Sequence, residues 1–254
     1  MSRLPTTTII INKMQIINGF DNLPKIMHAV ATLGSYDGVH SGHQVLINQV
    51  IARAKARGGK SIVLTFEPHP RITLGKAEGL KLLSTVEEKA LLLEMFGVDY
   101  MLIIPFDLEF SRLSHQEFIE RYLIEKLGIE ELVIGYNHHF GHNKSGDYSY
   151  LADKQLLAVT QVEQQRVEND KVSSTIIRTA LSNGDIATAT RLFGHRYIIC
   201  GESDQQGFVA TNIYKLLPPE GSYTAIVNGT TESVNICNNG IYCSVKSKNI
   251  IIEL

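Results

Sequence analysis

Gly34-Ser35-Tyr36-Asp37-Gly38-Val39-His40-Ser41-Gly42-His43 is the stretch that predicts the fold of this 254-residue chain. It follows an apolar run, 29–33, and precedes a segment in which apolar residues recur with helical spacing: Leu46, Ile47, Val50, Ile51 and Ala54. This pattern predicts a buried strand, a glycine-punctuated loop and an amphipathic helix.

A loop of this kind is a common way to build a phosphate site. The first turn of the helix offers free N–H groups and the positive end of its dipole, and Gly34, Gly38 and Gly42 let the backbone approach an anion closely. His40 and His43 flank Gly42, so both imidazoles can donate to phosphate oxygens or neutralise developing charge. The stretch therefore predicts a nucleotide site.

Outward from this loop, strand and helix patterns alternate. Short apolar runs predict strands at 14–17, 61–66, 100–105, 132–134 and 159–167, and Ser84–Glu87 and Ser114–Glu117 read as capping boxes that begin helices. Such alternation predicts an α/β fold with a mainly parallel, Rossmann-like sheet, whose ligands bind at the carboxyl ends of the strands. After residue 194 the helical period disappears, which predicts a first domain at 1–194 and a small β domain at 195–254.

Two further strand ends carry residues suited to a ligand. After the strand 61–66, Phe66, Pro68 and His69 lie in a loop that two prolines stiffen, and a plain exit from a strand is the alternative. Gly135 and Asn137 follow the strand 132–134, where an amide can bind ribose or phosphate. The neighbouring histidines, His138, His139 and His142, suggest a metal site or simply a polar loop, and without nearby cysteine or paired carboxylates we predict no metal ligands.

A second candidate anion site opens the helix that begins near residue 173. Ser174 and Thr175 offer hydroxyls and N–H groups, and the guanidinium of Arg178 can reach the same oxygens from one turn along. Taken alone, the pattern is better explained by an ordinary N-cap followed by a solvated arginine.

Composition excludes several classes of protein. Hydrophobic residues make up 44% of the chain, charged residues 20%, and the net charge of -2 provides no basic field for nucleic acid. No apolar run approaches the roughly 18 residues that span a bilayer, and 6–11 is too short for a signal sequence, so we expect a cytoplasmic protein without a membrane partner. Three cysteines without Cys-x-x-Cys spacing argue against a disulfide framework or a zinc site.

Three of these motifs resemble those of bacterial FAD synthetases, which usually carry a riboflavin kinase on the same chain. The loop 34–44, the string Thr-Phe-Glu-Pro-His-Pro at 65–70 and Ser-Ser-Thr-x-x-Arg at 173–178 match that family, whose nucleotidyltransferase superfamily shares the His-x-Gly-His spacing. The segment 134–141 also matches, except that His138 stands where an aromatic residue is usual. The resemblance covers nearly the whole chain, with strong motifs up to Arg178 and a weak tail.

The resemblance implies an FMN adenylyltransferase that makes FAD and pyrophosphate from FMN and ATP, with Mg2+ as cofactor. It assigns the catalytic residues and the flavin contacts as follows: His40, His43 and Arg178 for catalysis, and Phe66, Pro68 and His69 for flavin. It assigns the ATP contacts to Gly34, Ser35, Tyr36, Asp37, Gly42, Gly135, Asn137, Ser174 and Thr175.

The tail departs from the kinase of these relatives. Where their motif reads Gly-x-Pro-Thr-Ala-Asn, this chain has Val209 and Ala210 in place of proline and threonine, although Thr211 follows one position later. About 60 residues are also few for the kinase domain, so we expect the kinase activity to be lost or severely impaired. Three alternatives stay open: a bifunctional enzyme, a related nucleotidyltransferase with another acceptor, and a non-catalytic flavin-binding protein.

Overall fold

The computed structural model describes most of the chain. The described residues are 13–21, 23–136, 139–141, 145–154, 156–163, 166–167, 170–237 and 239–254. The N-terminal run 6–11 and three residues of the loop after the strand 132–134, namely Asn137, His138 and His142, lie outside them.

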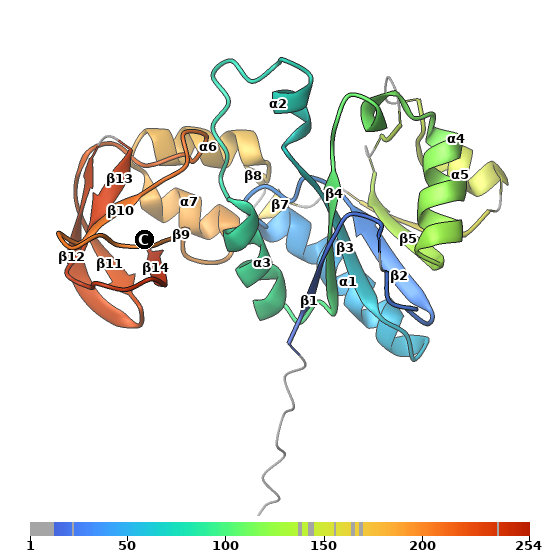
Figure 1. The fold of residues 1–254 in the computed structure, drawn as a ribbon, viewed down its shortest axis with the longest axis horizontal. Helices are drawn as coiled ribbons and strands as arrows, with labels where there is room; N and C mark the ends of the chain where they lie inside the picture. The colour runs from blue at the N-terminus through green and yellow to red at the C-terminus, as the bar shows by residue number, and fades with distance from the viewer. Residues whose placement is uncertain are drawn as a thin grey trace, which may run out of the picture.

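Within these residues, a six-stranded parallel sheet forms the centre of the larger part of the molecule (Figure 1). Its strands, in spatial order, are β1 (Gln15–Asn18), β4 (Tyr100–Pro105), β3 (Ser61–Glu67), β2 (Ala29–Leu33), β5 (Ile129–Gly135) and β6 (Ala158–Val162). All five residues of β2 are buried, since β2 lies between β3 and β5. The expected Rossmann-like α/β fold is confirmed.

Helix α1 (Ser41–Ala56) follows β2 and buries Ile47, Val50 and Ala54, as the apolar spacing predicted. The other helical segments of the described residues are α2 (Pro70–Thr73), α3 (Val86–Met95), η1 (Phe110–Arg112), α4 (His115–Glu117), the π-helix η2 (Phe118–Lys126), α5 (Tyr148–Lys154), α6 (Ser174–Ser182) and α7 (Ile186–Phe193).

Two expectations about local structure are wrong. The first capping box lies one residue later than predicted, at Thr85 and Glu88, because the hydroxyl of Ser84 instead accepts the N–H of Gly38. The predicted strand 159–167 ends at Val162, and the short strand β7 (Arg166–Val167) pairs with β8 (Asp170–Lys171) in a separate antiparallel ribbon. An apolar run alone does not reveal such a change of partner.

After α7 the described chain forms a second, six-stranded sheet that is antiparallel. Its strands, in spatial order, are β10 (Phe208–Ala210), β13 (Gly240–Tyr242), β12 (Thr230–Cys237), β11 (Gly221–Val227), β14 (Ile250–Glu253) and β9 (Ile198–Gly201). A bridge between Ser203 and Val209 joins the two edges, so the sheet curls towards a barrel. The small β unit expected in the tail is confirmed as a fold.

The tail sheet shares a hydrophobic core with α6 and α7. Leu181 and Phe193 from the helices pack in one cluster with Val227 and Ile252 from the sheet. The two helices therefore lie between the two sheets (Figure 1), and a domain boundary at 194/195 stays a prediction.

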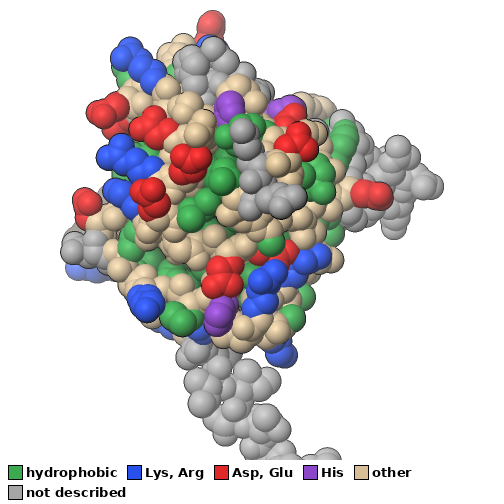
Figure 2. Space-filling view, turned by 90° about the vertical axis from the view of Figure 1, so that its right-hand side faces the viewer, with side chains coloured by type: hydrophobic (Ala, Val, Ile, Leu, Met, Phe, Trp, Pro, Cys, Tyr) green, Lys and Arg blue, Asp and Glu red, His purple; other side chains and the backbone are tan. Residues whose placement is uncertain are grey.

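The face that Figure 2 shows carries charged side chains of both signs, many of them along its left side and its lower part. Acidic and basic side chains are interspersed there, and neither sign covers a continuous area. Among the described helices, none has both the length and the apolar character that crossing a bilayer requires.

Candidate active site

The two histidines of the loop after β2 stack on each other at the start of α1. His40 is the N-cap residue, and its Nδ1 accepts the N–H of His43 at 3.4 Å. The ring centroids are 3.6 Å apart, with the planes inclined by 14°. A Cβ at Gly42 would lie 3.3 Å from the His40 ring, so glycine at this position permits the close approach.

Both imidazoles are neutral at neutral pH. Burial lowers the pKa of His40 to about 4, although the carboxylate of Asp37 opposes this shift. Burial, followed by the charges of His40 and Lys89, lowers the pKa of His43 well below its usual value. The histidines can therefore donate hydrogen bonds to phosphate, but they bring no positive charge before a substrate binds.

We expect these depressed pKa values to make folding stability depend on pH. Between pH 6.5 and 5, the unfolded chain binds protons at His40 and the folded chain does not, so stability falls as the pH falls. Each such site contributes about 1.4 kcal/mol per pH unit at most. Denaturant unfolding at pH 5 to 7 should show a smaller slope for His40→Asn, which keeps an N-cap side chain. If stability depended on pH equally in the variant and the wild type, the lowered pKa of His40 would be contradicted.

Asp37 connects the loop to two distant segments. Its Oδ1 accepts the N–H groups of Leu83 and Ser84 at 2.8 and 3.0 Å, and its Oδ2 accepts a hydrogen bond from Arg178 at 2.5 Å. The Nε of Arg178 also donates to the carbonyl of Lys81 at 2.7 Å. Because both carboxylate oxygens are engaged, Asp37 orients Arg178 in this structure, and its direct contact with ATP stays a prediction.

A cavity of about 760 Å³ lies over the histidines at the carboxyl ends of β2 and β5. Its lining includes most of the predicted nucleotide contacts, namely Gly34, Ser35, Tyr36, His40, Gly42, His43, Gly135 and Ser174. Thr175 is exposed and does not line it, and neither does Arg178. The α6 end of the site is held by Ser174, whose hydroxyl donates to the carbonyl of Asp37 at 3.3 Å.

A second cavity, of about 570 Å³, is aromatic and adjoins the first. Phe66, Phe106 and Phe110 line it, with ring centroids 5.3 Å apart for the first two and 5.8 Å for the last two. The two cavities share four lining residues: Leu33, Phe66, Pro70 and His139. An anionic end and a planar ring of one ligand can therefore occupy adjoining spaces.

The three residues predicted to contact the flavin do not all line the same cavity. Phe66 lines the aromatic cavity, whereas His69 lines the histidine cavity and Pro68 lines neither. Sequence reasoning missed Phe106, which follows β4 directly, and Phe110, which begins η1. The rule that ligands bind at the carboxyl ends of parallel strands would have pointed to them.

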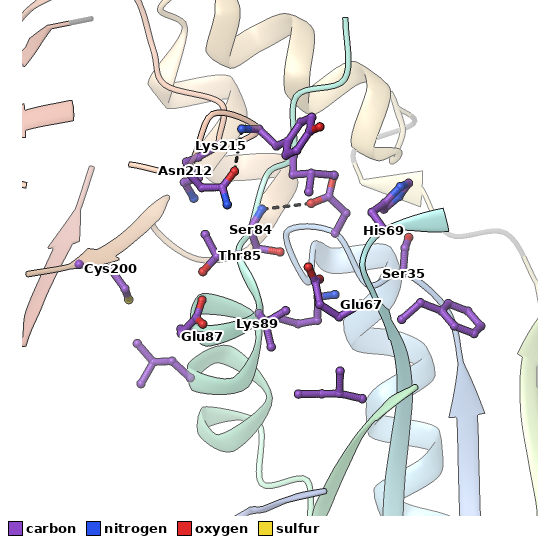
Figure 3. Close-up of a pocket in the computed structure, with 18 of the residues that line it drawn as sticks. Ser35, Glu67, His69, Ser84, Thr85, Glu87, Lys89, Cys200, Asn212 and Lys215 are labelled. Carbon is purple, nitrogen blue, oxygen red and sulfur yellow. Dashed lines mark hydrogen bonds between the residues drawn. The ribbon is translucent and has the colours of Figure 1, made fainter. Parts of the chain in front are cut away.

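A third cavity, of about 850 Å³, lies between the α3 side and the tail (Figure 3). Lys89 lines it and donates to the hydroxyl of Thr65 at 2.8 Å, and Thr65 donates to the carbonyl of Ser35 at 3.2 Å. Burial lowers the pKa of Lys89 to about 8, opposed by Asp37 and then Glu67. Through Thr65, Lys89 therefore stabilises the loop 34–43, a role that the helical pattern of α3 alone does not predict.

Sequence comparisons assign this chain to a known family. The family model for FAD synthetase matches residues 24–176. The bifunctional riboflavin kinase/FMN adenylyltransferase of Listeria monocytogenes is 36% identical over 222 residues, covering 81% of this chain and 70% of the relative. The Bacillus subtilis protein of the same name is 33% identical over 228 residues, covering 84% and 72%.

A solved structure shares the fold over almost the whole chain. The macrolide-efflux protein from Streptococcus pneumoniae superimposes with a TM-score of 0.80 over 94% of this chain and 89% of its own, at 21% identity. At that identity the likeness shows the fold alone. The family model and the relatives, together with the strand–loop–helix that carries the two histidines, show that this chain belongs to the FAD synthetase family.

Proposed function

We propose that this protein is an FMN adenylyltransferase, which forms FAD and pyrophosphate from FMN and ATP. The observation that carries the proposal is the pair of adjoining cavities, one with His40 and His43 and one with Phe66 and Phe110. Phosphate groups suit the first, and an isoalloxazine ring suits the second. The names of the relatives support the same pair of substrates.

In the proposed reaction, an oxygen of the FMN phosphate attacks the α-phosphorus of ATP. The new phosphorus–oxygen bond forms as the bond to the β-phosphate breaks, and pyrophosphate departs with the electron pair. Since the attacking oxygen is already anionic, no general base is required, and positioning and charge stabilisation carry the catalysis. His40 and His43 act as neutral donors to the α-phosphate oxygens.

The pyrophosphate side of the site is proposed at the start of α6. Ser174 and Thr175 supply donors there, and Arg178, oriented by Asp37, supplies the positive charge. Gly34, Ser35, Tyr36, Gly42, Gly135 and Asn137 complete the proposed ATP side.

Magnesium enters this proposal as a companion of ATP. The described residues contain no group of three or more His, Cys, Asp or Glu side chains placed to hold a metal ion. The described residues therefore offer no preformed metal site, and we propose that Mg2+ is held mainly by the phosphates of the substrates. Chelation by EDTA should stop FAD formation, and excess Mg2+ should restore it.

We also propose that riboflavin kinase activity is lost. In the kinase-like motif, Val209 is fully buried in the tail core and Ala210 has no hydroxyl. The side chain of Asn212 accepts the N–H of Tyr214 at 2.8 Å and so closes a local turn. These contacts give the motif a packing role.

A paired assay tests both parts. Purified protein, Mg2+ and ATP are incubated with FMN in one tube and with riboflavin in the other, and the products are separated by chromatography. We expect FAD from FMN and no product from riboflavin. Product from riboflavin would show a bifunctional enzyme, and tight flavin binding without pyrophosphate release would favour a non-catalytic flavin protein.

Phe110→Ala should raise the KM for FMN about 3- to 10-fold, since one aromatic contact contributes roughly 0.5–1.5 kcal/mol. The KM for ATP should stay unchanged, because Phe110 does not line the histidine cavity. Phe208→Ala, which removes a partly buried phenylalanine from the tail, is the matched control. Equal changes in both KM values would remove Phe110 from the flavin site.

A further inference from the structure

The tail contacts the chain segment just before α3 through residues 214–216, which lie between β10 and β11. The N–H of Leu82 donates to the carbonyl of Tyr214 at 2.6 Å, and the N–H of Leu216 donates to the carbonyl of Leu82 at 2.8 Å. These bonds form a parallel bridge between Leu82 and Lys215. Residues 214–216 therefore hold residues 82–84 in the manner of a neighbouring strand.

Lys215 extends this contact with a fully buried ammonium group. Its Nζ donates to the carbonyls of Leu83 and Ile198, each at 2.9 Å, and to Oε2 of Glu88 at 2.6 Å. The same Nζ lies 4.2 Å from the centre of the Tyr197 ring. An ammonium group has three donors, and all three are used here.

Glu88 completes the connection from the α3 side. Its Oε2 also accepts the N–H of Thr85 at 2.8 Å, and its Oε1 accepts the N–H of Cys200 in the tail at 2.9 Å. The side chains of Lys215 and Glu88 are each 1% exposed. Such a pair holds its geometry tightly, because every polar atom would lose a partner if either residue moved.

The segment fixed in this way faces the active-site loop on its other side. The N–H groups of Leu83 and Ser84 donate to Asp37, which binds Arg178 through its second oxygen. The hydroxyl of Ser84 accepts the N–H of Gly38 at 2.9 Å. Figure 3 shows Lys215 and Asn212 of the tail across from Ser84 and Thr85.

We propose that the tail sheet positions the adenylyltransferase site, and that Lys215 is the positioning residue. Lys215 holds Leu83, the amides of Leu83 and Ser84 hold Asp37, and Asp37 aims Arg178. This inference rests on the proposed function and assigns the tail a role in the ATP half of the reaction.

The test replaces the buried pair without leaving a buried charge. Lys215→Met with Glu88→Gln keeps the approximate volume of both side chains, so the protein should fold, as thermal unfolding will show. We expect kcat/KM for ATP to fall about tenfold, as is typical within one hydrogen-bond network. The KM for FMN should stay unchanged, because the aromatic cavity lies outside this network.

A double-mutant cycle separates positioning from general destabilisation. In an Arg178→Ala background, the same pair of substitutions should lower kcat/KM by less than about twofold, since the group that Lys215 positions is already absent. Lys246→Met with Glu232→Gln, the same changes at residues of the tail that contact none of the site, is the matched control and should have no effect. Lys215→Met with Glu88→Leu is the second variant if the first does not fold.

The outcomes separate this inference from the proposed function. Suppose that the wild type makes FAD. Positioning is then overturned, and the proposed function stands, if the Lys215→Met/Glu88→Gln protein is as active as the wild type. The same conclusion follows if this pair of substitutions lowers activity as much in the Arg178→Ala background as in the wild type. If the wild type makes no FAD, the proposed function falls, and ATP affinity decides: weaker binding by the variant supports positioning, and equal binding overturns it. Failure of both variants to fold would make Lys215 a folding residue only and overturn the inference.

Discussion

His43→Ala should lower the rate of FAD formation roughly 100- to 1,000-fold, the usual loss when one preorganised donor to a developing negative charge is removed. His43 lines the histidine cavity at the carboxyl ends of β2 and β5, and its buried Nδ1 has no hydrogen-bond partner among the described residues. Because the ring lines this cavity, it can contact a bound ligand there. Because the donor acts in the transition state, kcat and kcat/KM should fall together, as steady-state kinetics can measure.

The control for this variant is another histidine of the same chain. His28 is exposed and pairs with Glu130 on the surface, and its φ of 48° favours asparagine as the replacement. His28→Asn should keep full activity, and circular dichroism should show both variants folded. Near-normal FAD formation by His43→Ala would exclude the histidine from the mechanism.

Arg178→Ala should affect both activity and stability. The activity loss should again be about 100-fold or more, because the positive charge at the pyrophosphate side disappears. Stability should fall by about 3 kcal/mol, since the Asp37 carboxylate, at 4% side-chain exposure, loses its ion pair with Arg178 and retains the hydrogen bonds from the N–H groups of Leu83 and Ser84. This estimate is at the lower end for buried pairs because the arginine side chain remains 28% exposed.

A second substitution separates the two effects. Arg178→Ala with Asp37→Asn removes the buried charge, and the amide oxygen can still accept the N–H groups of Leu83 and Ser84. Denaturant unfolding should show most of the stability restored, whereas FAD formation should stay low. Recovery of activity together with stability would mean that Arg178 acts only through the fold.

The predictions for His43 and Arg178 rest on contacts of different range along the chain. His40 and His43 lie three residues apart at a helix start, so their proximity follows from the geometry of one turn. Arg178 meets Asp37 across 141 residues of chain, and Lys215 meets Leu83 across 132. No periodicity or capping signal reports contacts over such separations.

Elements that depend on short-range order could be predicted from the amino-acid pattern alone. The buried run of β2, the glycine loop and the apolar face of α1 are each encoded within a few residues, because strand and helix periods are local. The histidine pair and the hydroxyls at the start of α6 follow from the same reasoning. The class of site can therefore be predicted before any tertiary contact is known.

The partners that these residues take depend on how the folded chain packs. The capping box lies at Thr85 because the hydroxyl of Ser84 accepts the N–H of Gly38. Packing also places Phe106 and Phe110, which follow β4 in the chain, in the lining of the aromatic cavity. It also made the histidines neutral, since burial is a property of the packed molecule. Charge state, cavity shape and the contact of the tail with the catalytic loop all arise from packing between segments distant in sequence.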